Sequence, residues 1–395
     1  MTIGEAFETF KEDNPDCQIG KSSFASLRPK EVGLVSDMPH NVCGCKIHQN
    51  MILILSSLNK KLPNIFPAYS KNFVENCVCS VSSELCMSNS CPDCQDLQCF
   101  IENYVENISE HDMQKQLSWQ QWQNSAEQFI SKVTETGTIG KAVEVLQGQL
   151  SKFLWHSFVK FQQSSSYNDD RNDAIAEDSN LVLVQFDFSE NASTFNQDEI
   201  QSAYFAKRQI TIFTVVIWHK KQTVSWVILS DYTRHEKTAV AAFLAEILEF
   251  IKAKFPSAGN IKFWSDGPSS QFKSKYFFAL LCKLQALYPN FQLEHNYFAT
   301  SHGKGPCDGL GGTVKRLAQK EVLARRAEMN NAKDFCNIIN ISNTTIRATE
   351  MSEETIQERN VQLQTERLWS SVPSAVPGTQ NIHYIKPKDS ASVSS

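Results

Sequence analysis

Segments with strand and helix periodicity follow one another between residues 181 and 327 in an order that leaves few folds open. Three strand-like runs come first, and helices then alternate with strands. The expected strands cover residues 181–188, 209–219, 224–230, 261–265 and 291–298, and the expected helices cover residues 237–255, 273–287 and 308–327. The first three strands can pair as an antiparallel meander with a turn at residues 219–223, whereas the later strands need helical crossovers and join the sheet in parallel. The sequence therefore predicts an α/β domain in which helices flank a mixed sheet.

Three aspartates occupy particular positions in this pattern. Asp187 lies inside the first strand, although aspartate is disfavoured in strands. Asp266 ends the fourth strand, where Gly267 and Pro268 turn the chain out of the sheet, and Asp308 begins the last helix, where the helix dipole favours a carboxylate. Each residue alone has an ordinary explanation as a strand end, a turn or a helix cap. Their joint placement predicts a shared site at one edge of the sheet.

Carboxylates that converge repel one another unless cations bind between them. In phosphoryl transfer, two Mg²⁺ or Mn²⁺ ions roughly 3.5–4 Å apart activate the attacking oxygen and stabilise the leaving oxygen. Oxygen-only ligands suit these hard cations better than zinc. We therefore expect Asp187 to bridge two ions, with Asp266 binding one of them and Asp308 the other.

The segments around the three acids also carry a resemblance to a known family. They read Asp-Phe-Ser-Glu-Asn-Ala from Asp187, Trp-Ser-Asp-Gly-Pro-Ser-Ser-Gln-Phe-Lys around Asp266, and His-Gly-Lys-Gly-Pro-Cys-Asp-Gly-Leu-Gly-Gly-Thr-Val-Lys-Arg around Asp308. Together with the strand and helix order, they resemble DDE/D-type DNA transposases with a ribonuclease H-like catalytic domain, among them transposase-like proteins of animal genomes. The resemblance covers about residues 41–386. Most such enzymes have glutamate as the third acid, which leaves Glu294 and Glu321 as less favoured substitutes.

This resemblance implies a polynucleotidyl transferase that cuts a DNA strand and then joins the freed 3′-hydroxyl to target DNA. Its partners would be transposon ends and target DNA, it would act as a homo-oligomer without contact to a membrane, and its location would be nuclear. Two alternatives stay open. One is a catalytically inactive, domesticated transposase that serves as a DNA- or protein-binding module, and the other is a metal-dependent nuclease of the same fold.

The charge of the chain restricts how it contacts DNA. A formal net charge of −5 argues against coating of nucleic acid by bulk electrostatics, so that any contact must be local. Basic side chains and glycines surround the third acid, and glycines permit close approach of backbone to phosphate. The candidate DNA-binding residues are His302, Lys304, Lys315 and Arg316, although a loop followed by a solvated helical face explains the same pattern.

Cysteines are concentrated near the N-terminus, where nine of the twelve lie within the first 99 residues. No secretory signal precedes them, which favours metal ligation over disulfides. Cys45 with His48 and Cys91 with Cys94 have the two-residue intervals that direct two side chains to one tetrahedral Zn²⁺, and together they supply four ligands to a structural zinc. A second zinc or another ligand set is open, because further cysteines, Cys43, Cys79 and Cys86, lie nearby.

The remaining segments complete the expected organisation. Helical periodicity from residue 117 to about residue 163, followed by a polar loop at 164–173, predicts a helical connector. Within it, Trp119 and Trp122 are either core residues or side chains that stack on nucleic-acid bases. No run is long and apolar enough to span a bilayer. The expected parts are a poorly defined segment 1–40, a zinc module 41–100, a helical connector 101–179, a ribonuclease H-like catalytic domain 180–330, a C-terminal extension 331–386 and a disordered tail 387–395.

Overall fold

The structure is a computed structural model of the 395-residue chain. It describes residues 7, 10–27, 44–67, 69–94, 96–125, 129–299, 305–342, 344–372, 378–388 and 393–394. The chain divides into two compact units, Met1–Gly44 and Cys45–Ser395. The described part of the first unit contains the short helix α2 (Lys21–Ser26), which buries none of its side chains.

The second unit begins with a small helical module built around one core. The amphipathic helix α3 (Lys46–Lys61) buries Met51, Ile54 and Leu58. Its core partners include Phe73, Phe100 and Phe153. The other elements are α4 (Ser70–Cys77), α5 (Glu84–Met87), α6 (Leu97–Val105), α7 (Glu110–Met113), β1 (Gln116–Asn124), β2 (Ile130–Thr138) and α8 (Ile139–Ile175).

Two parts of the predicted helical connector are wrong. Residues 116–138 form the antiparallel hairpin β1–β2, in which Leu117 and Trp119 are buried while the residues between and beside them are exposed. The polar segment 164–173 is not a loop but the last part of α8. Its polar side chains have partners on the following domain, since Tyr167 donates a hydrogen bond to Gln185 and Asp170 accepts one from the Trp264 indole. These contacts make helix the favourable conformation there.

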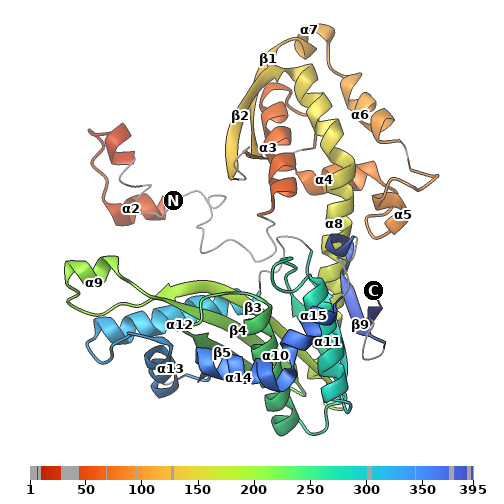
Figure 1. The fold of residues 1–395 in the computed structure, drawn as a ribbon. Helices are drawn as coiled ribbons and strands as arrows, with labels where there is room; N and C mark the ends of the chain where they lie inside the picture. Colours follow the sequence, from red (N-terminus) through yellow and green to blue (C-terminus); the bar gives the residue numbers. More distant parts are fainter. Residues whose placement is uncertain are drawn as a thin grey trace. The chain divides into compact units, whose positions relative to one another are not determined.

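The following domain is built on the predicted mixed sheet (Figure 1). In sequence order its elements are β3 (Leu181–Ser193), α9 (Gln201–Phe205), β4 (Gln209–His219), β5 (Gln222–Ser230), α10 (Lys237–Lys254), β6 (Asn260–Ser265), α11 (Lys275–Leu287), β7 (Gln292–Tyr297) and α12 (Pro306–Leu323). The strands β3, β4 and β5 pair antiparallel as the expected meander, and Lys220 and Lys221 form its second turn with φ of 44° and 61°. The strands β3, β6 and β7 pair in parallel. The order β5-β4-β3-β6-β7 across the sheet confirms the mixed topology.

The C-terminal extension expected over residues 331–386 contains regular structure. The chain continues through α13 (Ala332–Ile341), β8 (Arg347–Glu350), α14 (Glu353–Leu363), α15 (Thr365–Ser371), the 3₁₀ turn η2 (Thr379–Asn381), β9 (Tyr384–Pro387) and β10 (Val393–Ser394). Strand β8 adds to β5 in parallel and β9 adds to β7 antiparallel, so that the extension forms both edges of the sheet. Within the described residues, the order is β10-β9-β7-β6-β3-β4-β5-β8. Of the predicted disordered tail, residues 389–392 and 395 lie outside the described residues.

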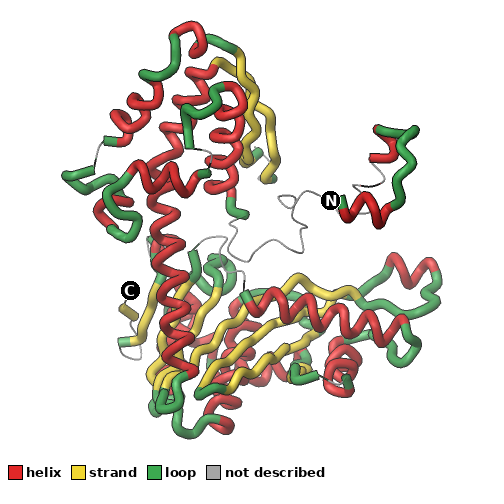
Figure 2. Tube along the Cα trace, turned by 180° about the vertical axis from the view of Figure 1, so that it is seen from behind, coloured by secondary structure: helices red, strands yellow, loops and turns green. Residues whose placement is uncertain are grey.

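Helices cover both faces of the sheet and enclose two apolar cores. The helices α10, α11 and α14 lie over one face (Figure 1), and their side chains share one core with Phe186 on β3. Side chains of α12, α13 and the end of α8 share the other with Leu183, and Figure 2 shows α8 and α12 over this second face. Among the described helices, none combines the length and the apolar character that crossing a membrane requires.

Candidate active site and metal-binding clusters

Asp187 and Asp266 lie at the same level of two adjacent parallel strands. The register of β3 and β6 places Gln185 opposite Trp264, and the two acids follow two residues later in each strand direction. Side chains alternate between the faces of a strand. Since Phe186 and Phe188 pack on the side of α10, Asp187 between them points to the other face, which α12 covers. The fold thus brings these two predicted site residues together.

Asp308 lies in the first turn of α12, where its carboxylate caps the helix. Its Oδ2 accepts a hydrogen bond of 2.8 Å from the Gly305 backbone N–H, and its side chain is exposed. The adjacent Cys307 is buried, and its thiol lies 3.5 Å from the Gln185 carbonyl oxygen and 3.8 Å from that of Thr214. These contacts fix the start of α12 against β3 and β4, beside Asp187.

Two glycines allow α12 to lie this close to the sheet. A Cβ atom at Gly311 would lie 2.2 Å from Ser189 Oγ, and one at Gly305 would lie 2.8 Å from Gln185 Nε2. At Gly309, by contrast, a Cβ atom would meet nothing within 4 Å. Two glycines of the segment around Asp308, Gly305 and Gly311, therefore have a packing role. This role is independent of any contact between the segment and phosphate.

We expect Gly311→Ala to displace α12 and to lower the free energy of unfolding by about 1–3 kcal/mol, because overpacking shifts backbone or forces side chains off their rotamers. Gly309→Ala is the matched control in the same helix, and it should be neutral or stabilising by up to about 1 kcal/mol because alanine favours helix. Urea unfolding of the two variants and the parent checks this. Equal stability of Gly311→Ala and the parent would contradict the close packing.

The three carboxylates influence one another electrostatically. Burial and the neighbouring Asp266 and Asp308 carboxylates raise the pKa of Asp187 to about 8. Burial and Asp308 raise the pKa of Asp266 to about 6. Asp266 Oδ1 is buried and has no hydrogen-bond partner among the described residues. Half-buried acids with such neighbours are costly unless a cation or a proton neutralises them, which is typical of functional sites.

These shifts predict how stability changes with pH. A folded-state pKa of Asp187 near 8, above its ordinary 3.8, means that the folded chain binds this proton more tightly than the unfolded chain. The free energy of unfolding should therefore fall as pH rises from about 5 to about 8. Asp187→Asn removes this penalty, so that without added Mg²⁺ or Mn²⁺ the variant should be more stable than the parent at about pH 8, by up to about 5 kcal/mol.

Urea unfolding at several pH values measures this difference. Asp198→Asn is the control, since Asp198 is exposed and pairs with Arg325 on the surface. Parallel pH profiles for the parent and Asp187→Asn would show that ionisation of Asp187 does not lower the free energy of unfolding.

The carboxylate oxygens do not by themselves form a closed cage. Among the described residues, the groups whose ligand atoms all lie within 4.8 Å of one another do not include the three aspartates. The two glutamates considered as substitutes are engaged elsewhere. Glu321 binds Arg326 at 2.6 Å and lies roughly 20 Å along α12 from Asp308 at 1.5 Å per residue, and Glu294 binds Lys386 at 2.7 Å. Asp308 therefore remains the acid nearest the other two.

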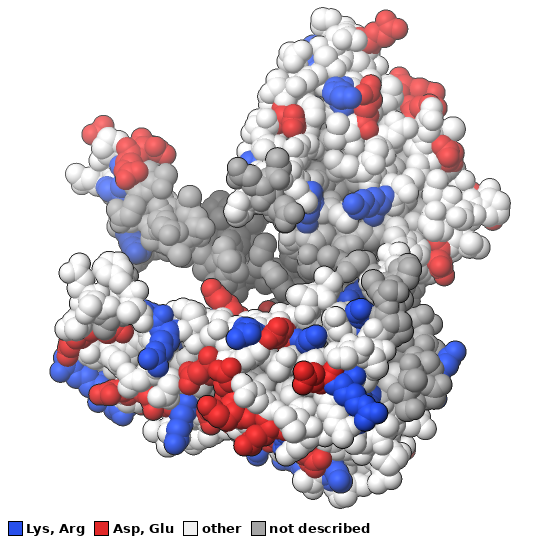
Figure 3. Space-filling model, in the orientation of Figure 1, with Lys and Arg blue, Asp and Glu red and all other residues white. Residues whose placement is uncertain are grey.

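The candidate DNA-binding residues are only partly described. His302 and Lys304 lie outside the described residues. On α12, Lys315 lies 3.3 Å from Glu190, and the exposed Arg316 donates a hydrogen bond to Thr313. Figure 3 shows Lys and Arg side chains interspersed with Asp and Glu over the described residues of one face.

A basic pocket that sequence reasoning missed lies beside the Asp266 turn. It has a volume of about 400 Å³. Three lysines, Lys237, Lys273 and Lys275, line it together with Ser269 and Ser270 from the turn itself. Lys273 is 4% exposed, and burial lowers its pKa to about 8. These lysines come from the starts of α10 and α11, so that only the fold reveals the cluster.

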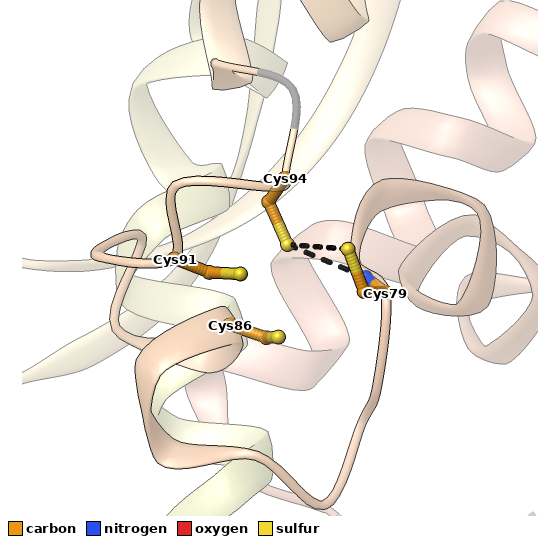
Figure 4. A group of neighbouring side chains, drawn as sticks. All are labelled: Cys79, Cys86, Cys91 and Cys94. Carbon is orange, nitrogen blue, oxygen red and sulfur yellow. Dashed lines mark hydrogen bonds between the residues drawn. The ribbon is translucent and has the colours of Figure 1, made fainter.

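In the helical module, four cysteines converge around α5. Cys79 precedes this helix, Cys86 lies in it, and Cys91 and Cys94 follow it. Their sulfur atoms all lie within 4.8 Å of one another and point to a common centre (Figure 4). Tetrahedral zinc with Zn–S bonds of about 2.3 Å would separate sulfur atoms by about 3.8 Å. The cluster therefore fits a metal ion such as zinc.

Hydrogen bonds prepare the same cluster for negative charge. The Ser83 hydroxyl lowers the pKa of Cys86 to about 7, against the effect of burial. The backbone N–H of Cys79 donates to Cys94 Sγ at 3.3 Å, and the two sulfur atoms are 3.4 Å apart. Even so, burial and the neighbouring thiols raise the pKa of Cys94 to about 12. A cation would remove this mutual repulsion of the sulfur atoms.

The structure divides the four predicted zinc ligands between two clusters. Cys91 and Cys94 join Cys79 and Cys86, whereas Cys45 and His48 group with His156 of α8. A single site formed by Cys45, His48, Cys91 and Cys94 is therefore not what the structure contains. His156 is separated from Cys45 by 111 residues and belongs to no motif, so that its part in the group could not be predicted. Cys43 lies outside the described residues.

Comparisons with known proteins agree with the division of the chain into an N-terminal unit, a helical module and a following domain. Three family models match, each described as a domain of unknown function, namely DUF8699 over residues 1–36, DUF8700 over residues 46–154 and DUF8701 over residues 163–395. The boundary between the last two falls within α8. No curated protein and no solved structure matches the chain. Since the model over residues 163–395 covers more than half of its length, the chain belongs to the family described as Domain of unknown function DUF8701.

Proposed function

We propose that the chain is a DNA transposase or a transposase-derived protein whose second unit carries out metal-dependent phosphoryl transfer on DNA. One observation carries this proposal. Two half-buried acids, Asp187 and Asp266, lie side by side at the ends of adjacent parallel strands, and a third, Asp308, raises the pKa of both. An arrangement that raises the pKa of half-buried carboxylates in this way is costly to the fold, and binding of divalent cations offsets the cost.

The topology supports the same assignment. Numbered along the chain from β3, the five central strands follow the order 3-2-1-4-5, with the first three antiparallel and the others parallel. This order resembles the ribonuclease H-like fold of DDE/D transposases. The acids lie on the first strand, after the fourth strand and on the last helix of this core, which are the positions of the catalytic acids in that family.

The residues around the acids suit the reaction. Two Mg²⁺ or Mn²⁺ ions bound by the aspartates would activate the attacking oxygen and stabilise the leaving oxygen of a phosphodiester. Asp266 Oδ1, buried without a partner among the described residues, is available as a ligand. The basic pocket beside the Asp266 turn provides lysine and serine donors for DNA phosphates.

One observation favours an inactive, domesticated protein as the second candidate. The Asp308 carboxylate binds the backbone of its own helix, and the three acids do not all approach within 4.8 Å among the described residues. A domesticated DNA- or protein-binding module would keep the fold without the need for a closed acid cluster. DNA binding without any cleavage would identify this case.

A single assay separates these functions. The full chain is incubated with supercoiled plasmid, a labelled oligonucleotide with a free 3′-hydroxyl, and Mn²⁺. A transposase joins the label covalently to the plasmid, whereas a nuclease of the same fold relaxes the plasmid without joining. If the protein retains zinc and a cooperative unfolding transition but forms neither product, this result would contradict catalytic activity. Nuclear location and assembly into homo-oligomers belong to the same proposal.

A further inference from the structure

We propose that Cys45, His48 and His156 form a second metal centre, separate from the four-cysteine cluster. This second centre binds zinc and keeps one coordination position exchangeable. The proposal concerns the helical module and is independent of the function proposed for the aspartates. It assigns one structural metal to the cysteines around α5 and another metal to the junction of α3 and α8.

The distances within the group suit one shared ion. Cys45 Sγ lies 3.1 Å from His48 Nδ1 and 3.1 Å from His156 Nε2, and all three ligand atoms lie within 4.8 Å of one another. Tetrahedral zinc with bonds of about 2.3 Å to sulfur and 2.0–2.1 Å to nitrogen would place sulfur about 3.5 Å from each nitrogen.

Neighbouring groups orient these ligands. His48 Nε2 lies 3.4 Å from Ser157 Oγ, which turns the opposite ring nitrogen, Nδ1, towards Cys45. Such a hydrogen bond to the second nitrogen is the usual companion of a metal-binding histidine. Cys45 is the N-cap of α3 and accepts a hydrogen bond from the His48 backbone N–H at 3.5 Å. The positive end of the helix favours the thiolate form that binds metal.

The ligands lie in a rigid part of the module. Asn50, one turn further along α3, both donates to the Trp122 carbonyl and accepts from the Trp122 N–H, at 3.0 and 2.7 Å. The helices α3 and α8 contribute to one apolar core. A metal bound by Cys45 and His156 would therefore join two elements that are already placed, without a large change in conformation.

A pocket gives access to this centre from outside. It has a volume of about 540 Å³, and Cys45 and His156 lie in its wall beside Lys46, Lys152 and Asn124. Zinc sites with three protein ligands and an accessible fourth position bind water or another small ligand there, in contrast to closed four-cysteine sites. The lysines in the wall would favour an anionic fourth ligand.

The zinc content of the purified full chain tests the proposal. Mass spectrometry of the metal should give two zinc ions per chain for the parent and one for His156→Ala. The double variant Cys79→Ser/Cys94→Ser should also retain one, and combining all three substitutions should remove both. His111→Ala is the control, since His111 of α7 belongs to neither cluster. One zinc ion in the parent, or two in a folded His156→Ala variant, would overturn the second centre.

Cobalt gives a second readout, which does not depend on the zinc count. In the Co²⁺-substituted parent, added azide should change the visible spectrum, because an exchangeable position can bind the anion. The change should be absent in His156→Ala, with the spectrum of the four-cysteine cluster retained. A parent spectrum that ignores azide would overturn the exchangeable position. If alkylation of Cys45 proceeded equally fast with and without zinc, Cys45 would pair with the histidines without a metal ion, and the second centre would be overturned.

Discussion

Asp187→Asn is expected to lower metal-dependent DNA strand cleavage by roughly 10³-fold or more, since a bridging metal ligand supports several kcal/mol of transition-state stabilisation. Asn keeps the shape of the side chain but has one oxygen and no charge, so that the fold should persist. Asp266→Asn and Asp308→Asn should have effects of similar size. Plasmid nicking and oligonucleotide joining with Mn²⁺, measured over a range of protein concentrations, give the rates.

Asp198→Asn is the matched control for these three substitutions, because Asp198 is exposed and pairs with Arg325 on the surface. Its cleavage rate should equal that of the parent. Retained activity in Asp187→Asn would remove this residue from the active site. Loss of activity in Asp198→Asn as well would point to a general loss of folded protein.

Replacement of two cysteines of the four-cysteine cluster, Cys79→Ser and Cys94→Ser, should release one metal ion and destabilise the helical module by roughly 3 kcal/mol or more. Binding of a structural zinc contributes directly to folding free energy, and the segment around α5 is short and contains few buried apolar residues to replace it. Thermal unfolding followed by circular dichroism, together with limited proteolysis of residues 78–96, measures the effect.

Cys99→Ser provides the comparison for the cysteine variant. Cys99 is exposed and lies outside both metal-binding clusters. It should therefore leave the zinc content and the unfolding temperature unchanged. If the double variant kept its full zinc content and the stability of the parent, the cluster would not be a metal site.

Much of the central sheet could be predicted because its strands are apolar and separated by clear turns. Strand β4 (Gln209–His219) was predicted at both ends, since ten of its positions are buried and carry the strand signal without interruption. The edge strands β8 and β9 could not be predicted, because each has four residues and only part of each is buried. Partners distant in sequence, β5 and β7, make them strands.

The helical module shows where local periodicity misleads. Trp119 and Trp122 are three residues apart, which is helical spacing, yet both lie on β1, where pairing with β2 decides the conformation. In the last part of α8 the composition is polar, but Asp170 binds both Lys262 and the Trp264 indole of β6. Tertiary contacts of this kind have no signature in a single sequence.

The candidate active site could be predicted in outline because strand ends and helix starts are visible in the sequence. The level of Asp187 and Asp266 on adjacent strands follows from the strand order alone. What could not be predicted is which distant side chains approach, as His156 of α8 does beside Cys45. His156 is a single residue, and its neighbours in the group come from a separate element.

Binding of Mn²⁺ to the purified chain, measured by calorimetry after the zinc content has been determined, tests the central claim most directly. If Asp187 and Asp266 share a divalent cation site, the parent binds Mn²⁺, and both Asp187→Asn and Asp266→Asn lose this binding while Asp198→Asn keeps it. Equal Mn²⁺ binding by the parent and both active-site variants would contradict the claim. The raised pKa values of Asp187 and Asp266 would then reflect burial and the neighbouring carboxylates, without a metal site.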